Sequence, residues 1–253
     1  MIETHAVTRE ISNGIVDALS MDPSHPTVSL QVARSEHEHY NELLRGILQD
    51  SSSSKLCHTI IDSSTDGHHM PDSVFIEDTA IVTLDTVLIT QPGAVSRRSE
   101  TRAVSLFFTT ESTTKRKKLY DMSELDSDAT MDGGDVLCIE FARLIIVGLS
   151  KRTNERGIAI LRQVFPSYQI WTVRVGEGAL HLKSFCSLFV SFAPLGETVI
   201  LVSNCHIGHD IARQIQLEKQ RLLDTVSESD GNSCFFLKPD MLRMVLVPNV
   251  PSS

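Results

Sequence analysis

The sequence predicts a mixed α/β fold built from a repeated unit of strands and a helix. Three short apolar runs, at residues 87–90, 144–147 and 199–202, are rich in β-branched side chains, so each is expected to form a buried strand. The runs begin 57 and 55 residues apart, and each is followed by a polar turn and then by a further segment. Recurrence of one pattern at a regular spacing indicates an internal repeat.

A second short strand is expected before each of these runs, at residues 74–76, 136–139 and 185–190. After the runs at 144–147 and 199–202, apolar side chains recur at helical spacing, and they are Ile158, Leu161, Val164, Ile207, Ile211 and Ile215. The segment after the first run is more ambiguous. The unit therefore reads as strand, strand and helix, with a short strand leading into the next unit.

An earlier helix belongs to a first unit near residues 4–70. Ser35 and Glu38 form a possible capping box at its start. Its expected apolar face consists of Tyr40, Leu43, Leu44, Ile47 and Leu48. Residues 234–237 and 244–247 are expected to open one more unit, which gives four units and the front of a fifth. Units that each hide part of their apolar surface must stack or close on each other. We therefore expect one domain over residues 1–253, shaped as a propeller whose fifth unit is incomplete.

Composition places the chain among ordinary globular proteins. It has 253 residues, of which 41% are hydrophobic and 22% are charged. The sequence shows neither an apolar run of membrane-spanning length nor a secretory signal at its N-terminus. A formal net charge of -9 disfavours nucleic-acid binding. The five scattered cysteines are expected to be free thiols in a reducing compartment, so we expect a cytoplasmic protein with no membrane partner.

Acidic side chains flank one of the expected strands. Asp72 precedes the run 74–76, and Glu77 and Asp78 follow it as an adjacent pair. Carboxylates at such positions are either turn caps or cation binders. Spacing alone favours the turn interpretation.

Three further patterns allow both a structural and a functional interpretation. Asp132 opens an Asp-Gly-Gly sequence that suits a turn, although the glycines could also let the backbone approach a ligand. His181 is a lone histidine, and lone histidines are more often structural groups than catalysts. Arg97 and Arg152 lie at equivalent places in the repeat. They are either surface charges or a pair of guanidinium groups that binds the carboxylate of a ligand.

The polar stretch around Asp66, His68 and His69, with Cys57 and His58 before it, fits no firm zinc pattern. We interpret it as a loop and expect neither a metal nor another cofactor.

Taken together, the segments PDSVFIEDTA, ITQPGAVSRRSE, MDGGDVL, VGLSKRTNERG and LHLKSFCS resemble the signature stretches of the dimethylarginine dimethylaminohydrolases. The resemblance covers roughly residues 4–239 and is densest between 71 and 187. It implies the pentein fold, a ring of five ββαβ units, and a cytosolic enzyme of arginine metabolism linked to nitric oxide regulation.

The resemblance also implies a reaction. In this family, a cysteine thiolate attacks the guanidinium carbon of an Nω-methylated arginine, a histidine protonates the leaving methylamine, and water then releases citrulline. By motif match, His181 would be the acid and base.

The matched motifs also assign binding residues. Asp72 and Asp78 would hold the guanidinium, Glu77 would lie beside the pocket supporting the histidine, and Asp132 would contribute to the acidic network around it. Arg97 and Arg152 would clamp the substrate carboxylate. Leu19 would lie in a lid over the pocket.

The sequence departs from the family at two places. The family's nucleophilic cysteine lies near the C-terminus, whereas the last cysteine here is Cys234, which matches a structural cysteine. Residues 102–120 also diverge, where a helix and a strand are expected.

The first departure leaves alternatives open. The chain is expected to be a dimethylargininase by descent that is inactive without the nucleophile. Alternatively, it is a non-catalytic protein of the same fold that binds arginine derivatives or a partner. A third possibility, an arginine deiminase, is disfavoured by the SRR and LSKRTNERG segments. The oligomeric state is left open.

Overall fold

The computed structural model describes residues 4–19, 28–49, 56–62, 70–111, 117–190, 198–228 and 242–247. The chain divides into two compact units, residues 1–121 and 122–253. A single domain over residues 1–253 stays a prediction. Within the described ranges, each helix is either too short or too polar to cross a membrane.

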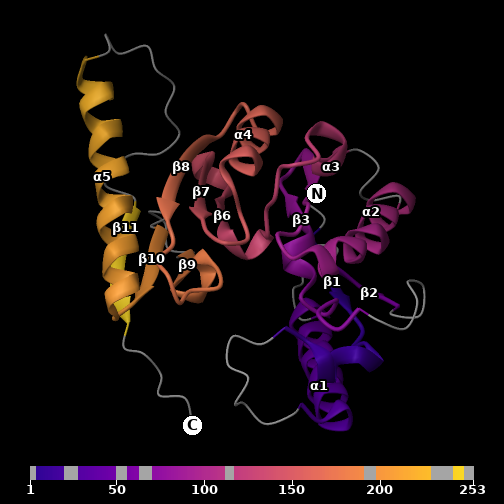
Figure 1. Cartoon of the computed structure of the whole chain (residues 1–253). Coiled ribbons are helices and arrows are strands. Elements are labelled where there is room, and N and C mark those ends of the chain that lie inside the picture. Colours follow the sequence, from indigo (N-terminus) through magenta and orange to yellow (C-terminus); the bar gives the residue numbers. More distant parts are fainter. Residues whose placement is uncertain are drawn as a thin grey trace. The chain divides into compact units, whose positions relative to one another are not determined.

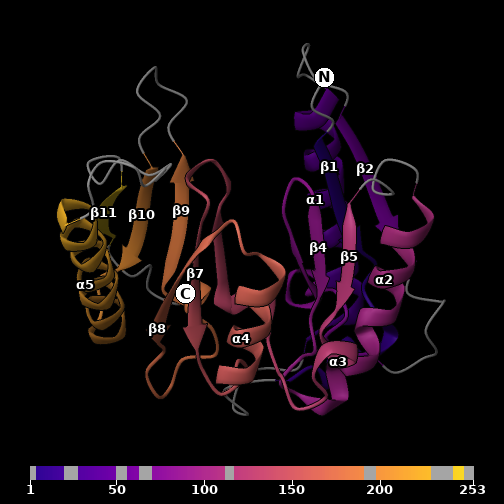
Figure 2. The ribbon, with the colours of Figure 1, turned by 90° about the horizontal axis from the view of Figure 1, so that it is seen from above.

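The first unit contains two small sheets (Figures 1 and 2). In one, β1 (Thr4–Arg9) and β2 (Leu56–Ile61) run parallel, and α1 (Leu30–Gln49) lies between them in the chain. In the other, β4 (Thr86–Ile89) pairs antiparallel with β3 (Ala80–Val82) and parallel with β5 (Lys118–Asp121). The helix α2 (Thr101–Thr110) connects β4 to β5 and packs against both β4 and β2.

The second unit begins with the short helix α3 (Met122–Leu125) and contains two three-stranded sheets. In the first, β7 (Leu144–Leu149) pairs antiparallel with β6 (Val136–Ile139) and parallel with β8 (Gln169–Arg174), which follows α4 (Glu155–Val164). In the second, β10 (Thr198–Ser203) pairs antiparallel with β9 (Cys186–Val190) and parallel with β11 (Leu242–Val247), which follows α5 (His206–Glu228).

The repeat predicted from the sequence is confirmed at the level of strand pairing. Each of the three complete sheets has a central strand with an antiparallel partner before it and a parallel partner after a helix. The three apolar runs form the central strands β4, β7 and β10. In β4 and β7 the side chains of these runs are buried on both sides of the sheet, and residues 144–147 of β7 are 0% exposed. In β10, buried Ile200 and Val202 alternate with partly buried Val199 and Leu201.

The sequence of residues 102–120 diverges from that of the family, but the expected helix and strand still form there, as α2 and β5. Arrangement of the units as a five-unit ring stays a prediction.

The strand predicted at residues 74–76 is wrong. The chain makes a turn and a short 3-10 helix (Ile76–Thr79) there, and the strand β3 begins at Ala80. The Phe75 N–H donates to the Asp72 carbonyl (3.0 Å), and the Asp78 N–H donates to the Phe75 carbonyl (3.2 Å). These local hydrogen bonds replace the ladder hydrogen bonds that a strand would make.

Two expectations for α1 are also wrong. The helix begins at Leu30, where the Ser29 hydroxyl accepts from the Val32 N–H (3.5 Å), so Ser35 lies inside the helix. Of the expected apolar face, Tyr40 is 54% exposed and Ile47 is 70% exposed. The helix instead turns polar side chains such as Asn41, which is 4% exposed, toward β1 and β2. Periodicity identifies an amphipathic helix, but it does not decide which face meets a sheet.

The run at residues 244–247 forms a strand, but it does not open a fifth unit. It lies in β11, which pairs in parallel with β10 and completes the unit of β9 and β10. Residues 234–237 lie outside the described residues.

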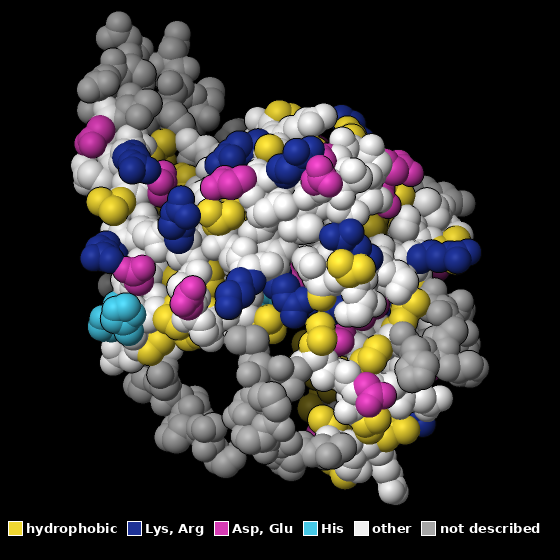
Figure 3. Space-filling model, viewed as in Figure 1, with side chains coloured by type: hydrophobic (Ala, Val, Ile, Leu, Met, Phe, Trp, Pro, Cys, Tyr) yellow, Lys and Arg dark blue, Asp and Glu magenta, His cyan; other side chains and the backbone are white. Residues whose placement is uncertain are grey.

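The helix α5 shows how these helices meet solvent. On the face seen in Figure 3, acidic and basic side chains are interspersed along it. The i,i+3 ion pairs Arg213–Asp210 and Arg221–Glu218 lie on this helix. The opposite side buries Ile211 and Ile215 against β10 and its neighbours.

Candidate functional site

A buried arginine organises the acidic residues of the first unit. Arg97 lies in a 3-10 helix (Val95–Glu100) and is 4% exposed. Its Nη1 is 2.7 Å from Asp78 Oδ2, and its Nε donates to Glu100 Oε2 at 3.0 Å. Its Nη2 donates at 3.3 Å to the main-chain carbonyls of Asp72 and Phe75. The guanidinium therefore joins the turn that carries Asp72 to the 3-10 helix that carries Asp78.

Charge balance inside this cluster depends on Glu100, which sequence reasoning missed. Glu100 is 0% exposed, and its main-chain carbonyl also accepts from Arg9 Nη1 (2.9 Å). Burial raises the pKa of Glu100 to about 7, although the charge and hydrogen bond of Arg97 act in the opposite direction. Burial alone would lower the pKa of Arg97, but Asp78 and Glu100 together raise it above its ordinary value. The signal in the sequence was the i,i+3 spacing of Arg97 and Glu100.

The other two predicted residues of the first unit lie at its surface. The Leu19 N–H donates to both carboxylate oxygens of Asp72, at 3.0 and 3.3 Å, while its side chain is 50% exposed. Asp72 is 5% exposed, so the backbone at Leu19 helps to hold a buried carboxylate. Glu77 is exposed and lines a largely apolar cavity of about 310 Å³ together with Phe107 and Lys117.

In the second unit, a buried acid and a histidine form a close pair. His181 Nε2 lies 2.9 Å from Asp132 Oδ2, and the two residues are 49 positions apart in the chain. Asp132 is 0% exposed and His181 is 9% exposed. The neutral ring can donate its Nε2 hydrogen to the carboxylate, which selects one tautomer and fixes the orientation of the ring.

A second buried acid, Asp135, holds the segments on which this pair depends, and sequence reasoning missed it as well. Its Oδ2 accepts from the hydroxyls of Ser150 (2.6 Å) and Thr153 (2.7 Å). Its Oδ1 accepts from the Leu182 N–H at 2.8 Å, directly after His181. Burial raises the pKa of Asp135, and these three hydrogen bonds oppose that rise. The Asp-Gly-Gly-Asp sequence carried the only hint, because Asp132 and Asp135 are three residues apart.

Equivalent repeat positions do not give Arg97 and Arg152 equivalent environments. Arg152 is half-buried, and its backbone N–H donates to Ser150 Oγ (2.9 Å). Considering only residues that the structure describes, its guanidinium makes no hydrogen bond or ion pair. Arg97, in contrast, has donors committed to the acids of its own unit.

The described cysteines differ in their readiness to form thiolates. Burial raises the pKa of both Cys138 and Cys186 to about 12, so these thiols are protonated at neutral pH. Cys205 precedes α5, and hydrogen bonds from the Gly208 N–H and the Ser203 hydroxyl lower its pKa. Cys234 lies outside the described residues.

Most of the histidine-rich stretch also lies outside the described residues, at Asp66, His68 and His69. His58 belongs to β2, where its Nε2 lies 2.9 Å from the Thr8 hydroxyl. Cys57 precedes it in the same strand and is a free thiol.

Comparison with known proteins identifies relatives of this chain. The family model described as arginine deiminase matches residues 51–173. Human DDAH2 is 30% identical over 255 residues, which cover 98% of this chain and 77% of the human protein. The N(G),N(G)-dimethylarginine dimethylaminohydrolase of Streptomyces coelicolor is 41% identical over 115 residues, which cover 45% of this chain and 41% of that protein.

The fold also has a match among solved structures. One is the Pseudomonas aeruginosa DDAH, a cysteine-to-serine mutant complexed with citrulline, with a TM-score of 0.64 and 21% identity. The alignment covers 97% of this chain and 76% of that one, so the two share the mixed α/β fold of the pentein proteins. Because the human relative is similar over nearly the whole of this chain, the chain belongs to the dimethylarginine dimethylaminohydrolase family and is an enzyme by family.

Proposed function

We propose that the chain binds Nω-methylated arginines and hydrolyses them to citrulline and a methylamine. The observation that carries this proposal is the buried Asp132–His181 pair at 2.9 Å, on a scaffold tied together by Asp135. Such a pair suits a histidine that must give up and recover a proton in a fixed orientation. Family membership supports the substrate class.

In the proposed reaction, Asp72 and Asp78 hold the guanidinium group, because carboxylates match the planar N–H donors of that cation. In the family's reaction a cysteine thiolate adds to the guanidinium carbon, and the Cys234 variant below tests whether the last cysteine of this chain takes that role. His181 then gives a proton to the leaving methylamine as the C–N bond breaks. The ring takes a proton from water as that water displaces the thiolate and releases citrulline. Because Nε2 faces Asp132, the proton exchanged with the ligand belongs to Nδ1.

Arg97 and Arg152, which were predicted to bind the substrate carboxylate together, are proposed to have different roles because their surroundings differ. Arg152, whose guanidinium has no hydrogen bond or ion pair to the described residues, is proposed to bind the substrate carboxylate. Arg97 is proposed to set the position of Asp78 through their 2.7 Å contact. Glu77 and Leu19 are proposed to act at the edge of the ligand site, Leu19 through its exposed side chain.

The test measures binding and turnover separately. The purified chain is incubated with asymmetric dimethylarginine, and citrulline and dimethylamine are quantified. Calorimetry measures the binding of L-citrulline. We expect His181→Ala to retain citrulline binding within about threefold and to lose at least about a hundredfold in turnover, the usual contribution of a positioned acid and base. His209→Ala, on the exposed start of α5, is the matched control and should change neither quantity.

A second function, binding of arginine derivatives without turnover, has support from two of the described thiols. Cys138 and Cys186 are protonated at neutral pH and so are poor nucleophiles, whereas the pKa of Cys205 is lowered. Citrulline binding without product formation would select this function. Turnover that Cys234→Ala abolishes in a folded variant would assign the nucleophile to Cys234. A folded chain that binds neither dimethylarginine nor citrulline would refute both functions.

A further inference from the structure

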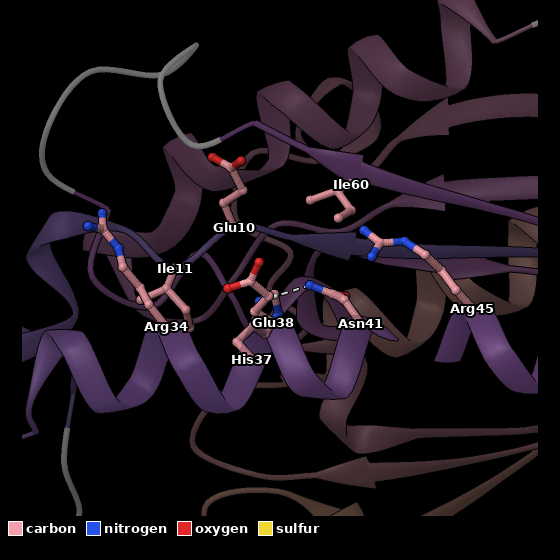
Figure 4. Close-up of a pocket in the computed structure, with 8 residues that line it drawn as sticks. All are labelled: Glu10, Ile11, Arg34, His37, Glu38, Asn41, Arg45 and Ile60. Atoms are coloured by element: carbon pink, nitrogen blue, oxygen red, sulfur yellow. Dashed lines mark hydrogen bonds between the residues drawn. The ribbon is translucent and has the colours of Figure 1, made fainter. Parts of the chain in front are cut away.

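A cavity of about 320 Å³ lies in the first unit between α1 and the β1–β2 sheet (Figure 4). It contains none of the residues assigned above to the methylarginine site. The helix contributes one continuous polar face, formed by Arg34, His37, Glu38, Asn41 and Arg45. Chain segments next to the strands contribute Glu10 and Ile11, and β2 contributes Ile60.

The floor of the cavity, formed by His37 and Asn41, is held by a directed chain of hydrogen bonds that continues to β1 and β2. The Thr8 hydroxyl donates to Asn41 Oδ1 at 2.9 Å, so its contact with His58 Nε2, also 2.9 Å, has the histidine as donor. Asn41 Nδ2 in turn donates to His37 Nδ1 at 3.2 Å. Burial lowers the pKa of His37, which keeps the ring neutral and able to accept this bond. Asn41 is 4% exposed, so the floor is fixed before any ligand arrives.

Side chains of opposite charge line the cavity. Figure 4 shows the Arg45 guanidinium entering from one end, and the carboxylates of Glu10 and Glu38 at the other. Among the described residues, Glu38 and Arg45 form no ion pair with each other or with a third group. Arg34 turns away and donates to Asn13 Oδ1 at 2.7 Å. Of the two arginines that line the cavity, Arg34 is therefore engaged with Asn13, and Arg45 is the cation that faces the acids across it.

Apolar surface lies between these charges. Ile11 is 8% exposed and Ile60 is partly buried, and both line the cavity. A ligand that fits has a carboxylate for the arginine, an ammonium for the acids, and a hydrocarbon part for the two isoleucines. We propose that this cavity is a second binding site, separate from the methylarginine site, for an α-amino acid zwitterion with an apolar side chain.

The experiment uses the full chain labelled with ¹⁵N and three probes that carry the same branched hydrocarbon group. L-leucine carries both charges, 3-methylbutylamine lacks the carboxylate, and 4-methylpentanoate lacks the ammonium. Nuclear magnetic resonance titration follows the side-chain amide of Asn41 and the backbone amides of α1. We expect saturable shifts with leucine, and at least tenfold weaker binding of each singly charged probe, because each loses one charged hydrogen-bonding partner.

Variants test the assigned ends. Arg45→Gln should weaken leucine binding about tenfold, since it removes the cation that meets the carboxylate. Glu38→Gln should weaken it by only about threefold, because the Glu10 side chain remains at the same end of the cavity. Glu42→Gln is the matched control, since Glu42 is on α1 but not in the cavity lining, and it should bind within about twofold of the unaltered chain.

Three results would overturn the proposal. They are the absence of a leucine-dependent shift at Asn41, equal binding of a singly charged probe, and equal weakening by Glu42→Gln and Arg45→Gln. Loss of citrulline binding to the methylarginine site would leave this result untouched, so the two proposals fail independently.

Discussion

Removal of the Asp135 carboxylate is predicted to loosen the second unit around His181. Asp135→Ala takes away the acceptor of two hydroxyl hydrogens and one backbone N–H, all at 2.6 to 2.8 Å. Hydrogen bonds to a charged group contribute about 1.5–3 kcal/mol each. The Ser150 and Thr153 hydroxyls can turn to other acceptors, but the Leu182 N–H cannot. We therefore expect a loss of about 3–5 kcal/mol in the free energy of unfolding.

Asp135→Asn separates the shape of this side chain from its charge. The amide oxygen can still accept from the Leu182 N–H, while the amide nitrogen meets hydroxyls that must rotate to accept from it. The expected loss is about 1–2 kcal/mol. For a chain of this length, the larger loss expected for Asp135→Ala corresponds to a melting temperature about 10 °C below that of the unaltered protein.

The assay is urea unfolding followed by circular dichroism, with citrulline binding measured on the folded fraction. Asp128→Asn is the control, because Asp128 is exposed and lies in the same unit. It should stay within about 0.5 kcal/mol. The reasoning is refuted if Asp135→Ala costs less than about 1 kcal/mol, or if Asp135→Asn is as damaging as the alanine variant.

Three further predictions concern substitutions at Arg97, His58 and Gly157. Arg97→Ala removes the guanidinium that forms ion pairs with two buried carboxylates and should cost about 3–5 kcal/mol in urea unfolding, whereas Arg98→Ala should cost less than about 1 kcal/mol. Burial lowers the pKa of His58, so the folded chain should lose stability as pH falls below about 6.5, and His58→Gln should reduce that loss in melting curves recorded from pH 7 to 5. Gly157→Ala would place a methyl group against the Thr130 carbonyl and should lower the melting temperature. Gly46→Ala meets no atom within 4 Å and should gain up to about 1 kcal/mol from helix propensity, so a loss equal to that of Gly157→Ala would contradict this explanation.

Local sequence patterns predicted the elements that depend on local physics. The runs at 87–90, 144–147 and 199–202 became central strands because short segments rich in apolar β-branched residues are stabilised by burial inside a sheet. The helix containing Ile158, Leu161 and Val164 formed as predicted, with the Asn154 side chain accepting from the Gly157 N–H at its start. These features were predictable because each depends on residues a few positions apart.

Errors arose where two local interpretations compete. Residues 74–76 are apolar enough for a strand, but the chain forms a hydrogen-bonded turn after Asp72, and the strand β3 begins only at Ala80. In α1 the apolar stripe containing Tyr40 and Ile47 faces solvent, because Asn41 and Thr8 satisfy each other and allow a polar face to be buried. Neither outcome is encoded in periodicity alone.

The candidate site divides in the same way. The motifs singled out Asp132, His181 and Arg97 as side chains of interest, while Asp135 and Glu100 carried only the weak signal of a three-residue spacing from Asp132 and from Arg97.

By itself, the sequence determined the repeated strand and helix pattern, the family, and the residue types available for chemistry. Only the tertiary structure decided which of those residues touch. It placed His181 beside Asp132 across 49 residues, and it enclosed Arg97 between two acids. The physical reason is that burial changes the free energy of a charge only when distant segments exclude water from it together, and such exclusion is a property of packing between elements.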